Sequence, residues 1–393
     1  RSRAALVATL CCCAMASEQT CRKVPFTLLG SGGVGAALLK AIVGARELHD
    51  TSYGLRFCAE AVCDSSGIAK TTDGELSDEA IAAILAHKAG GGKLADLVLS
   101  GVTITAKSAD VATSAFLEAQ VEREGGMLID CTATGDTIPA LLATAAAGGR
   151  VVSANKKPFA SDYNAFKALV RRAAAPGTVR FESSVGAGLP VIAALQRTIA
   201  AADPVSSISG SFSGTLGYVM SGLQEGRPFS EVVLTAKDLG YTEPDPRDDL
   251  GGVDVARKAL ILARCLGMQL ELDEVAVEPL YPPELASLSV ADFMAALPSL
   301  DASFTQRVAA AAAAGKVLRY AASVDPATSS LTVGLKEVPA SSALGTLSGS
   351  DNLVEIYTRW YADNPLVLRG AGAGAGATAA GVLADMIDLA YTA

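Results

Sequence analysis

The chain is 393 residues long and half of its residues are hydrophobic, so it can form two or three domains with sizeable cores. Only 19% of the residues are charged, which argues against general disorder. The formal net charge of −9, with no basic stripe, disfavours nucleic acid as a partner, and no apolar segment is long enough to span a membrane.

The eight cysteines give no recognisable pattern of disulfides or metal ligands. Three are adjacent at 11–13, no CxxC pair occurs, and the chain has only two histidines. The sequence therefore supports neither a zinc site nor a redox motif, and it favours reduced thiols inside a cell.

Residues 1–22 form an N-terminal extension with two interpretations. Basic residues at 1–3, an apolar run at 4–14 and Ala-Met-Ala at 14–16 resemble a signal peptide with a cleavage site. Alternatively, Met15 is the true start and the residues before it are upstream readthrough. We expect a cytoplasmic enzyme, with plastid-type targeting by residues 1–16 left open.

Strand-like and helix-like segments then alternate along the first part of the chain. Strands are expected at 24–29, 55–62, 97–99, 127–131 and 150–153, and helices at 34–45, 78–89, 109–124 and 138–147. This alternation predicts an α/β fold, a Rossmann-type doubly wound parallel sheet with helices on both faces. We assign it to residues 23–180.

The pattern changes to α+β over residues 181–369, which we expect to form a substrate domain. Strands are predicted at 178–182, 206–213, 331–338 and 353–361, with a helix at 188–201. In the tail, 370–393, a glycine-rich turn leads into a helix at 379–390, which is expected to complete the first domain.

A glycine-rich turn follows the first strand and opens the first helix, the context in which such a turn binds a dinucleotide pyrophosphate. The alternative is a glycine turn without a ligand. The residues of this glycine-rich turn are Gly30, Ser31, Gly32, Gly33, Val34 and Gly35. Asp64, after the second strand, can accept from ribose hydroxyls, which favours NAD, whereas the adjacent serines and Lys70 can tolerate the phosphate of NADP. We expect use of both cofactors.

Alcohol oxidation requires a group that takes the hydroxyl proton. The two histidines, His49 and His87, are expected at the surface of the cofactor domain, so lysine is the better candidate. Lys258 lies four residues after Asp254 on a predicted helix, so the two share a face. A surface ion pair is the alternative, but the preceding Gly251 suits close approach of a ligand better than a solvated helix.

Residues 236–258 contain several carboxylates close in sequence to Lys258. This segment resembles the signature segment of homoserine dehydrogenases. Residues 153–158, 182–190 and 378–383 are similar to three further elements of that family, in order. The resemblance implies a short, monofunctional homoserine dehydrogenase without a C-terminal regulatory domain, active as a homodimer joined through the sheet of a substrate-binding and dimerisation domain.

The resemblance also implies roles for individual residues. Lys258 would transfer the proton, with Lys156 beside the reacting centre and Asp249 in electrostatic support. The implied substrate ligands are Glu243, Asp254 and Tyr241. The implied cofactor contacts beyond the glycine turn are Asp64, Thr132, Lys156, Gly240 and Gly376. A sodium ion would be held by Glu182, Val185, Ala187 and Leu189.

Two rivals remain on the sequence alone. One is an NAD(P)-dependent oxidoreductase of another amino-acid aldehyde on the same scaffold. The other is a nucleotide-sensing protein without catalysis, which has no need for a proton-transfer group and is therefore disfavoured by Lys156 and Lys258.

Overall fold

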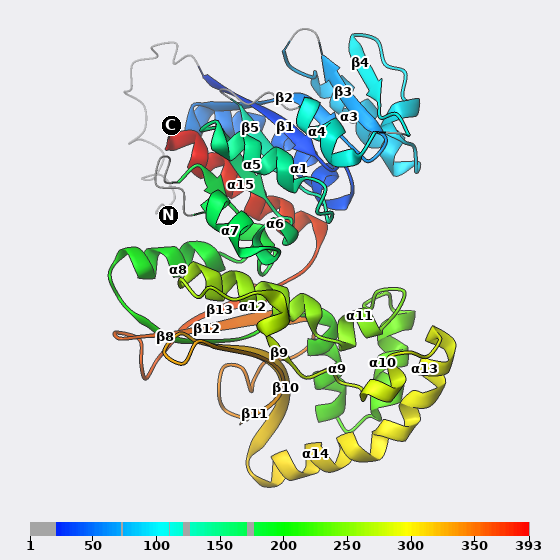
Figure 1. Ribbon diagram of the computed structural model, residues 1–393, viewed down its shortest axis with the longest axis vertical. Coiled ribbons are helices and arrows are strands. Elements are labelled where there is room, and N and C mark those ends of the chain that lie inside the picture. Colours follow the sequence, from blue (N-terminus) through cyan, green and yellow to red (C-terminus); the bar gives the residue numbers. More distant parts are fainter. Residues whose placement is uncertain (1–20, 72–73, 110, 121–125, 171–176, 393) are drawn as a thin grey trace, which may run out of the picture.

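The computed structural model describes residues 21–392 apart from 72–73, 110, 121–125 and 171–176. Most of the N-terminal extension therefore lies outside the described residues, as do parts of the helix expected at 109–124. Figure 1 shows two sheets, one in each half of the molecule. Within the described ranges, every helix is too short or too polar to cross a bilayer.

The first sheet has seven strands. In spatial order they are β4 (Val102–Ala106), β3 (Gly67–Thr71), β2 (Leu55–Cys63), β1 (Arg22–Leu29), β5 (Met127–Asp130), β6 (Arg150–Ser153) and β7 (Val179–Arg180). From β2 to β7 the strands are parallel, and β1, β2, β5 and β6 are short apolar runs that are buried as central parallel strands should be. The α/β fold class is thus confirmed.

One predicted strand of this sheet is wrong, and two strands were missed. The segment 97–99 is not a strand; it follows a short 3₁₀ turn (Leu94–Asp96), and Val98 is 95% exposed. The sheet instead gains β3 and β4, which pair antiparallel with β2 and with each other. β4 is the edge strand and is largely exposed, and β3 beside it is buried at only three of its five residues, so neither has the continuous apolar run that identifies the central strands.

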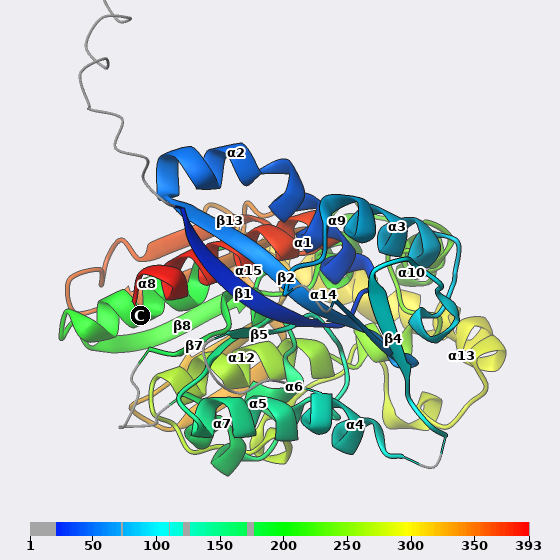
Figure 2. The same cartoon turned by 90° about the horizontal axis from the view of Figure 1, so that it is seen from above.

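Helices cover both faces of this sheet, as Figure 2 shows from above. One face carries α1 (Gly33–Gly44), α3 (Asp78–Ala89) and α15 (Ala375–Tyr391), and near them lie the short α2 (Arg46–Leu48) and a π-helical turn (His49–Tyr53). The other carries α4 (Thr113–Gln120), α5 (Ile138–Ala146) and α7 (Tyr163–Val170), preceded by α6 (Lys157–Ala160). Because α15 returns from the end of the chain to pack on α1, the tail is part of this half.

The second sheet has six strands and is antiparallel except where β9 joins β11. Their order is β13 (Leu366–Ala371), β12 (Asp351–Thr358), β8 (Val205–Ser211), β10 (Lys316–Asp325), β11 (Ser330–Pro339) and β9 (Ala276–Val277). The helices of this half are α8 (Val191–Ala200), α9 (Gly214–Gln224), α10 (Phe229–Asp238), α11 (Arg247–Leu250), α12 (Val253–Cys265), α13 (Val290–Ala296) and α14 (Asp301–Ala313).

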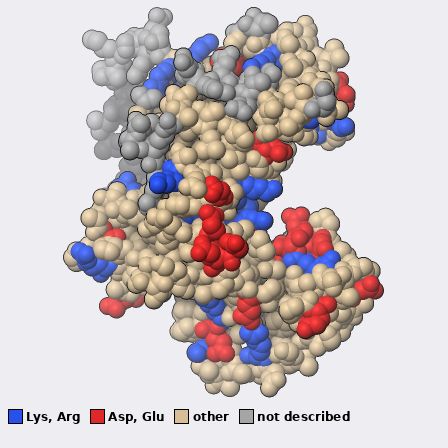
Figure 3. All heavy atoms as spheres, in the orientation of Figure 1, with Lys and Arg blue, Asp and Glu red and all other residues tan. Residues whose placement is uncertain are grey.

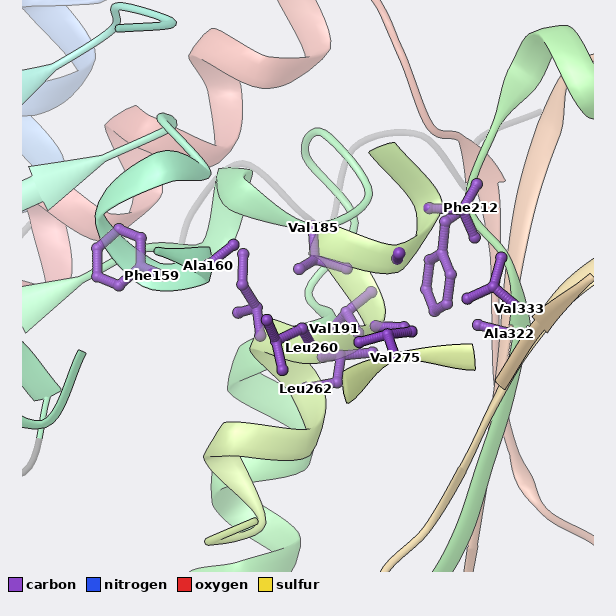
Figure 4. Packing of buried hydrophobic residues seen from close by; sticks show 14 of the residues in the cluster. Phe159, Ala160, Val185, Val191, Phe212, Leu260, Leu262, Val275, Ala322 and Val333 are labelled. Carbon is purple, nitrogen blue, oxygen red and sulfur yellow. The ribbon is translucent and has the colours of Figure 1, made fainter. Parts of the chain in front are cut away.

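The apolar face of α12 anchors that helix between the two halves. Leu260 and Leu262 are fully buried in a cluster that reaches Phe159 of α6 on one side and Val333 of the second sheet on the other (Figure 4). A helix fixed this firmly can hold the polar residues of its first turns in a defined position.

Candidate active site

The glycine turn is shaped for close approach of the backbone to a ligand. A Cβ at Gly35 would lie 1.9 Å from the Gly30 carbonyl oxygen, and one at Gly30 would lie 2.9 Å from Thr132 Cγ2. Helix α1 begins at Gly33 without a side-chain cap, so its first N–H groups point outward as anion donors. The Ser31 hydroxyl is buried and has no hydrogen-bond partner among the described residues. These features fit a dinucleotide pyrophosphate.

A cavity of about 460 Å³ lies where the carboxyl ends of the parallel strands meet the second half. Its wall includes Gly33, Val34, Thr132 and Lys156 from the predicted cofactor set, together with Lys258. The loop 372–375, before α15, closes another side. The remaining predicted cofactor residues do not line it: Gly30, Ser31, Gly32, Gly35, Asp64, Gly240 and Gly376.

Asp64 is engaged within the protein. One carboxylate oxygen accepts from the backbone N–H and the hydroxyl of Ser66, and the other accepts from Lys88 Nζ at 2.5 Å and Leu94 N at 3.0 Å. Burial alone would raise the pKa of Asp64, but the hydrogen bonds from Lys88 and Ser66 lower it below the usual value. Its role toward a ribose therefore stays a prediction, and it requires these contacts to rearrange.

The histidine prediction is wrong for His49. Its ring is buried, 4% exposed, and packs edge-on against Phe57 at 5.5 Å. His87 lies partly exposed on α3, where Nε2 is 2.7 Å from the Lys93 carbonyl oxygen. Neither histidine lines the cavity.

Two buried residues fix the loops on which Thr132 and Lys156 sit: Asp130, which the sequence did not single out, and Asn155, which belongs to the segment 153–158 of the family resemblance. Asp130 ends β5, is fully buried, and accepts from the hydroxyls of Thr132 and Thr137, each at 2.7 Å. Asn155, next to Lys156, donates from Nδ2 to Asp130 at 3.0 Å. The available signal was their position, since each lies at the carboxyl end of a buried parallel strand.

Lys156 and Lys258 both form ion pairs with the same carboxylate, that of Asp254. Asp254 Oδ1 lies 3.2 Å from Lys156 Nζ, and Asp254 Oδ2 lies 2.9 Å from Lys258 Nζ. Lys258 also donates to the Phe212 carbonyl oxygen at 2.6 Å, and its side chain is only 12% exposed. The predicted pair on one face of α12 is therefore present, and the third residue comes from the other half of the molecule.

This cluster shifts two pKa values. Burial lowers the pKa of Lys258, and although Asp254 opposes the shift, Lys156 adds to it. Burial would raise the pKa of Asp254, but the two lysines hold it at about 2. A lysine with a lowered pKa beside an ionised carboxylate is suited to exchange a proton with a ligand.

Residues 243–249, called the acidic loop below, line a larger cleft. Glu243 is exposed to this cleft, and its backbone N–H donates to Asp249 at 2.8 Å, so Asp249 holds the loop in place. Burial raises the pKa of Asp249. Tyr241 is 48% exposed and packs edge-on against Tyr218 rather than lining the cleft.

The cleft has a volume of about 1240 Å³ and joins the smaller cavity, because Lys156 and Ala133 line both. Figure 3 shows acidic side chains with basic ones beside them on both sides of the notch between the two halves. A space lined by both carboxylates and cationic groups suits a small zwitterion.

The four predicted sodium ligands lie in one buried loop between β7 and α8. Both carboxylate oxygens of Glu182 accept from the start of α8, from Ile192 N and Ala193 N at 2.7 Å each. The Glu182 side chain is thus a helix cap, and burial raises its pKa to about 6. Ala187 has φ +58°, so the chain turns sharply within this loop. Backbone carbonyl oxygens are donors that a hard cation can use.

Comparison with known proteins decides the family. A family model for homoserine dehydrogenase matches residues 190–387. A homoserine dehydrogenase of Emericella nidulans is 47% identical over 255 residues, which cover 62% of this chain and 69% of the relative. The chain belongs to the homoserine dehydrogenase family. A Saccharomyces cerevisiae homoserine dehydrogenase is 45% identical over 249 residues, with the same coverage of each chain.

The fold agrees with this assignment. A hyperthermophilic archaeal homoserine dehydrogenase in complex with NADPH superposes with a TM-score of 0.70 at 21% identity, covering 95% of this chain and 99% of the other. The predicted family is thus confirmed. The homoserine dehydrogenase model matches the acidic loop and α12 but starts after the glycine turn and Lys156, so the arrangement of those parts rests on the geometry above.

Proposed function

We propose that this chain interconverts L-homoserine and L-aspartate 4-semialdehyde with NAD(P). The observation that carries the proposal is the Asp254 carboxylate, which holds Lys156 and Lys258 together where the cofactor-sized cavity joins the acidic cleft. Bound in that cavity, NAD(P)⁺ would accept a hydride from the terminal carbon of homoserine. In the reductive direction, the homoserine that forms would supply the synthesis of threonine, methionine and isoleucine.

Proton transfer is assigned to Lys258. In the oxidative direction its neutral amine takes the proton of the substrate hydroxyl as the C–H bond yields its hydride, so an alcohol becomes an aldehyde and the lysine becomes an ammonium. In the reductive direction the ammonium returns that proton. Lys156, held by the other oxygen of Asp254, stabilises negative charge on the reacting oxygen, and Asp249 supports the site by fixing the acidic loop.

The acidic loop accounts for the choice of substrate. Glu243 faces the cleft and is the proposed ligand of the substrate ammonium group, with Asp254 nearer the reacting end. Tyr241, beside Tyr218, would shape the rim through its loop rather than by direct contact.

NADP and NAD both remain proposed cofactors. Asp64 is tied to Lys88, which reduces its availability for a ribose and places an ammonium group beside the end of β2. Complex formation with NADPH in the archaeal relative supports NADP. Initial rates with each cofactor at matched concentrations test this choice.

A sodium ion is proposed in the loop 182–189, through the backbone carbonyl oxygens of Val185, Ala187 and Leu189 and, since its carboxylate caps α8, that of Glu182. Within the described ranges no cluster of acidic, histidine or cysteine side chains could hold a metal, so carbonyl groups are the available donors. The ion would stiffen the loop that borders the cofactor cavity.

We further propose a homodimer through the second sheet. Three exposed apolar side chains, Trp360, Tyr361 and Val367, gather on β13 and the turn before it. Trp360 is the only tryptophan of the chain and is 74% exposed. We expect its emission to shift to shorter wavelength as the protein concentration rises, in parallel with the mass from light scattering; a monomer at all concentrations would contradict the proposal.

The test of the function is turnover of the purified protein with L-homoserine, L-serine and L-threonine, each with NADP⁺ and NAD⁺. The proposal requires homoserine to be the best of the three substrates. Preference for another amino-acid alcohol would favour the alternative oxidoreductase, and cofactor binding without turnover of any alcohol would favour the nucleotide sensor. We expect the protein to reside in the cytoplasm, or in an organelle if residues 1–16 are a targeting segment. The location of a fluorescent fusion at the C-terminus tests this expectation.

A further inference from the structure

Ser184 has a buried hydroxyl that the proposed chemistry does not use. Its side chain is 1% exposed, and Oγ has no hydrogen-bond partner among the described residues. Leaving a polar group unpaired in this way is unfavourable. Ser184 lines the cofactor cavity together with Lys156 and Lys258, and a rotation of its unpaired side chain would bring the hydroxyl toward a bound molecule.

The other side-chain hydroxyls of that cavity are already bonded within the protein. Ser183 donates to the Thr378 carbonyl oxygen at 2.8 Å, Thr378 donates to the Gly374 carbonyl oxygen at 2.9 Å, and Thr132 donates to Asp130 at 2.7 Å. Ser184 alone among the hydroxyls lining this cavity lacks such a partner. Its backbone is fixed, since its N–H donates to the Phe181 carbonyl oxygen at 3.0 Å.

The position of Ser184 within the cavity indicates what it would bind. Gly33 and Val34, at the start of α1, form the anion-binding end of the cavity, and Lys258 marks the proposed reacting end. Ser184 borders the cavity but not the acidic cleft, so it belongs with the cofactor rather than the amino acid. At the reacting end of a nicotinamide dinucleotide, the ring carries one hydrogen-bonding substituent, its carboxamide.

We propose that the Ser184 hydroxyl hydrogen-bonds to the nicotinamide carboxamide and so fixes which face of the ring is presented to the substrate beside Lys258. The proposal rests on the proposed function, because it requires a nicotinamide cofactor in this cavity. Ser184 is a cofactor-positioning residue in this account, and no bond is made or broken at its oxygen.

Equilibrium binding tests the proposal without turnover. The Kd is measured by calorimetry for the cofactor that the native protein binds more tightly, and for the same molecule without its nicotinamide, ADP-ribose or 2′-phospho-ADP-ribose. Ser184→Ala is expected to weaken binding of the whole cofactor about fivefold to tenfold, the effect of one hydrogen bond, and to leave binding of the fragment unchanged. Ser184→Thr, which keeps a hydroxyl, is expected to retain most of the affinity.

Ser161→Ala is the matched control, because Ser161 Oγ is also buried without a partner among the described residues but lines neither the cavity nor the cleft. It should bind both molecules as the native protein does. Equal weakening of cofactor and fragment by Ser184→Ala would show a structural role and overturn the proposal, as would no weakening of either. If the native protein bound neither cofactor, the proposed function itself would fail, a result distinct from both.

Discussion

At the residue scale, the Asp254 carboxylate forms ion pairs with two lysines. Asp254 contacts Lys156 and Lys258 through different oxygens, so each ammonium group is held without either losing access to the joined cavity and cleft. Burial pushes the pKa of Lys258 down while Asp254 pushes it up. With its pKa lowered, Lys258 gives up its proton more readily than a free lysine, as a group that both takes and returns a proton requires.

Replacement of Asp254 by Asn is predicted to separate these effects. Because Asp254 raises the pKa of Lys258, its loss should lower that pKa further, and the pH at which homoserine oxidation reaches its plateau should move to lower pH. We also expect kcat/KM to fall about tenfold or more, since both lysines lose their anchor. Asp248→Asn, at an exposed carboxylate of the same cleft, should leave the profile unchanged. A shift of the Asp254→Asn profile to higher pH would contradict the account.

Individual site residues were predictable only where the chain places them close together. Asp254 and Lys258 are four residues apart on one helix, so their contact follows from helical spacing. The partner Lys156 lies about a hundred residues earlier, and only the resemblance indicated it. Burial of His49 was missed because it depends on the packing of a π-helical turn against Phe57, which no local pattern records.

At the scale of elements, the start of α12 positions the site. Gly252 precedes the helix with φ +74°, and a Cβ there would lie 2.0 Å from the hydroxyl oxygen of Tyr320, which itself donates to the Glu278 carbonyl oxygen. The chain can therefore turn into α12, between α11 and the second sheet, only with glycine at this position. The turn fixes Asp254 within the first turn of the helix.

Gly252→Ala is accordingly predicted to destabilise the protein by about 3 kcal/mol or more, through both the left-handed backbone and the clash. Gly226→Ala is the matched control, because Gly226 has φ +84° with open space around its Cβ position. That variant should cost only about 1–2 kcal/mol. The apparent Tm of the two variants, measured side by side, checks the difference; equal losses would mean that the contact with Tyr320 is unimportant.

Elements with strong burial were predictable, and edge elements were not. The central strands β1, β5 and β6 and helices α1, α5 and α15 agree with their expected ranges within a few residues, because apolar runs and helical periodicity are direct consequences of burial. Strands β3 and β4 were missed, since strands at this end of the sheet are specified by pairing with their neighbours rather than by their own composition.

At the scale of the whole molecule, the end of the chain joins the two halves. Helix α15 packs on α1, while Asp385 in its middle accepts from the Glu182 backbone N–H at 2.8 Å, at the start of the loop between β7 and α8. Burial raises the pKa of Asp385 to about 8, with Glu182 and Asp388 adding to the shift and Arg180 opposing it. This contact joins residues 203 positions apart, which no sequence pattern could indicate.

The raised pKa predicts how stability depends on pH. Between its ordinary value of 3.8 and about 8, the folded protein keeps a proton on Asp385 that the unfolded chain has lost, so stability falls as pH rises through this range. Asp385→Asn keeps an acceptor for the Glu182 N–H and removes the titration. Its apparent Tm relative to the native protein should therefore rise from pH 5 to pH 8; a constant difference would contradict this assignment.

The central claim is that Lys258 transfers the proton, and chemical rescue tests it most directly. Lys258→Ala is predicted to lose about 10²–10⁴-fold in kcat for homoserine oxidation at alkaline pH while keeping its Kd for the cofactor. Added methylamine or ethylamine should restore part of that rate in proportion to its concentration, because the small amine can occupy the space left by the side chain. A variant that keeps its rate, or one that loses it and regains nothing with any amine while still binding cofactor and substrate, would contradict the account.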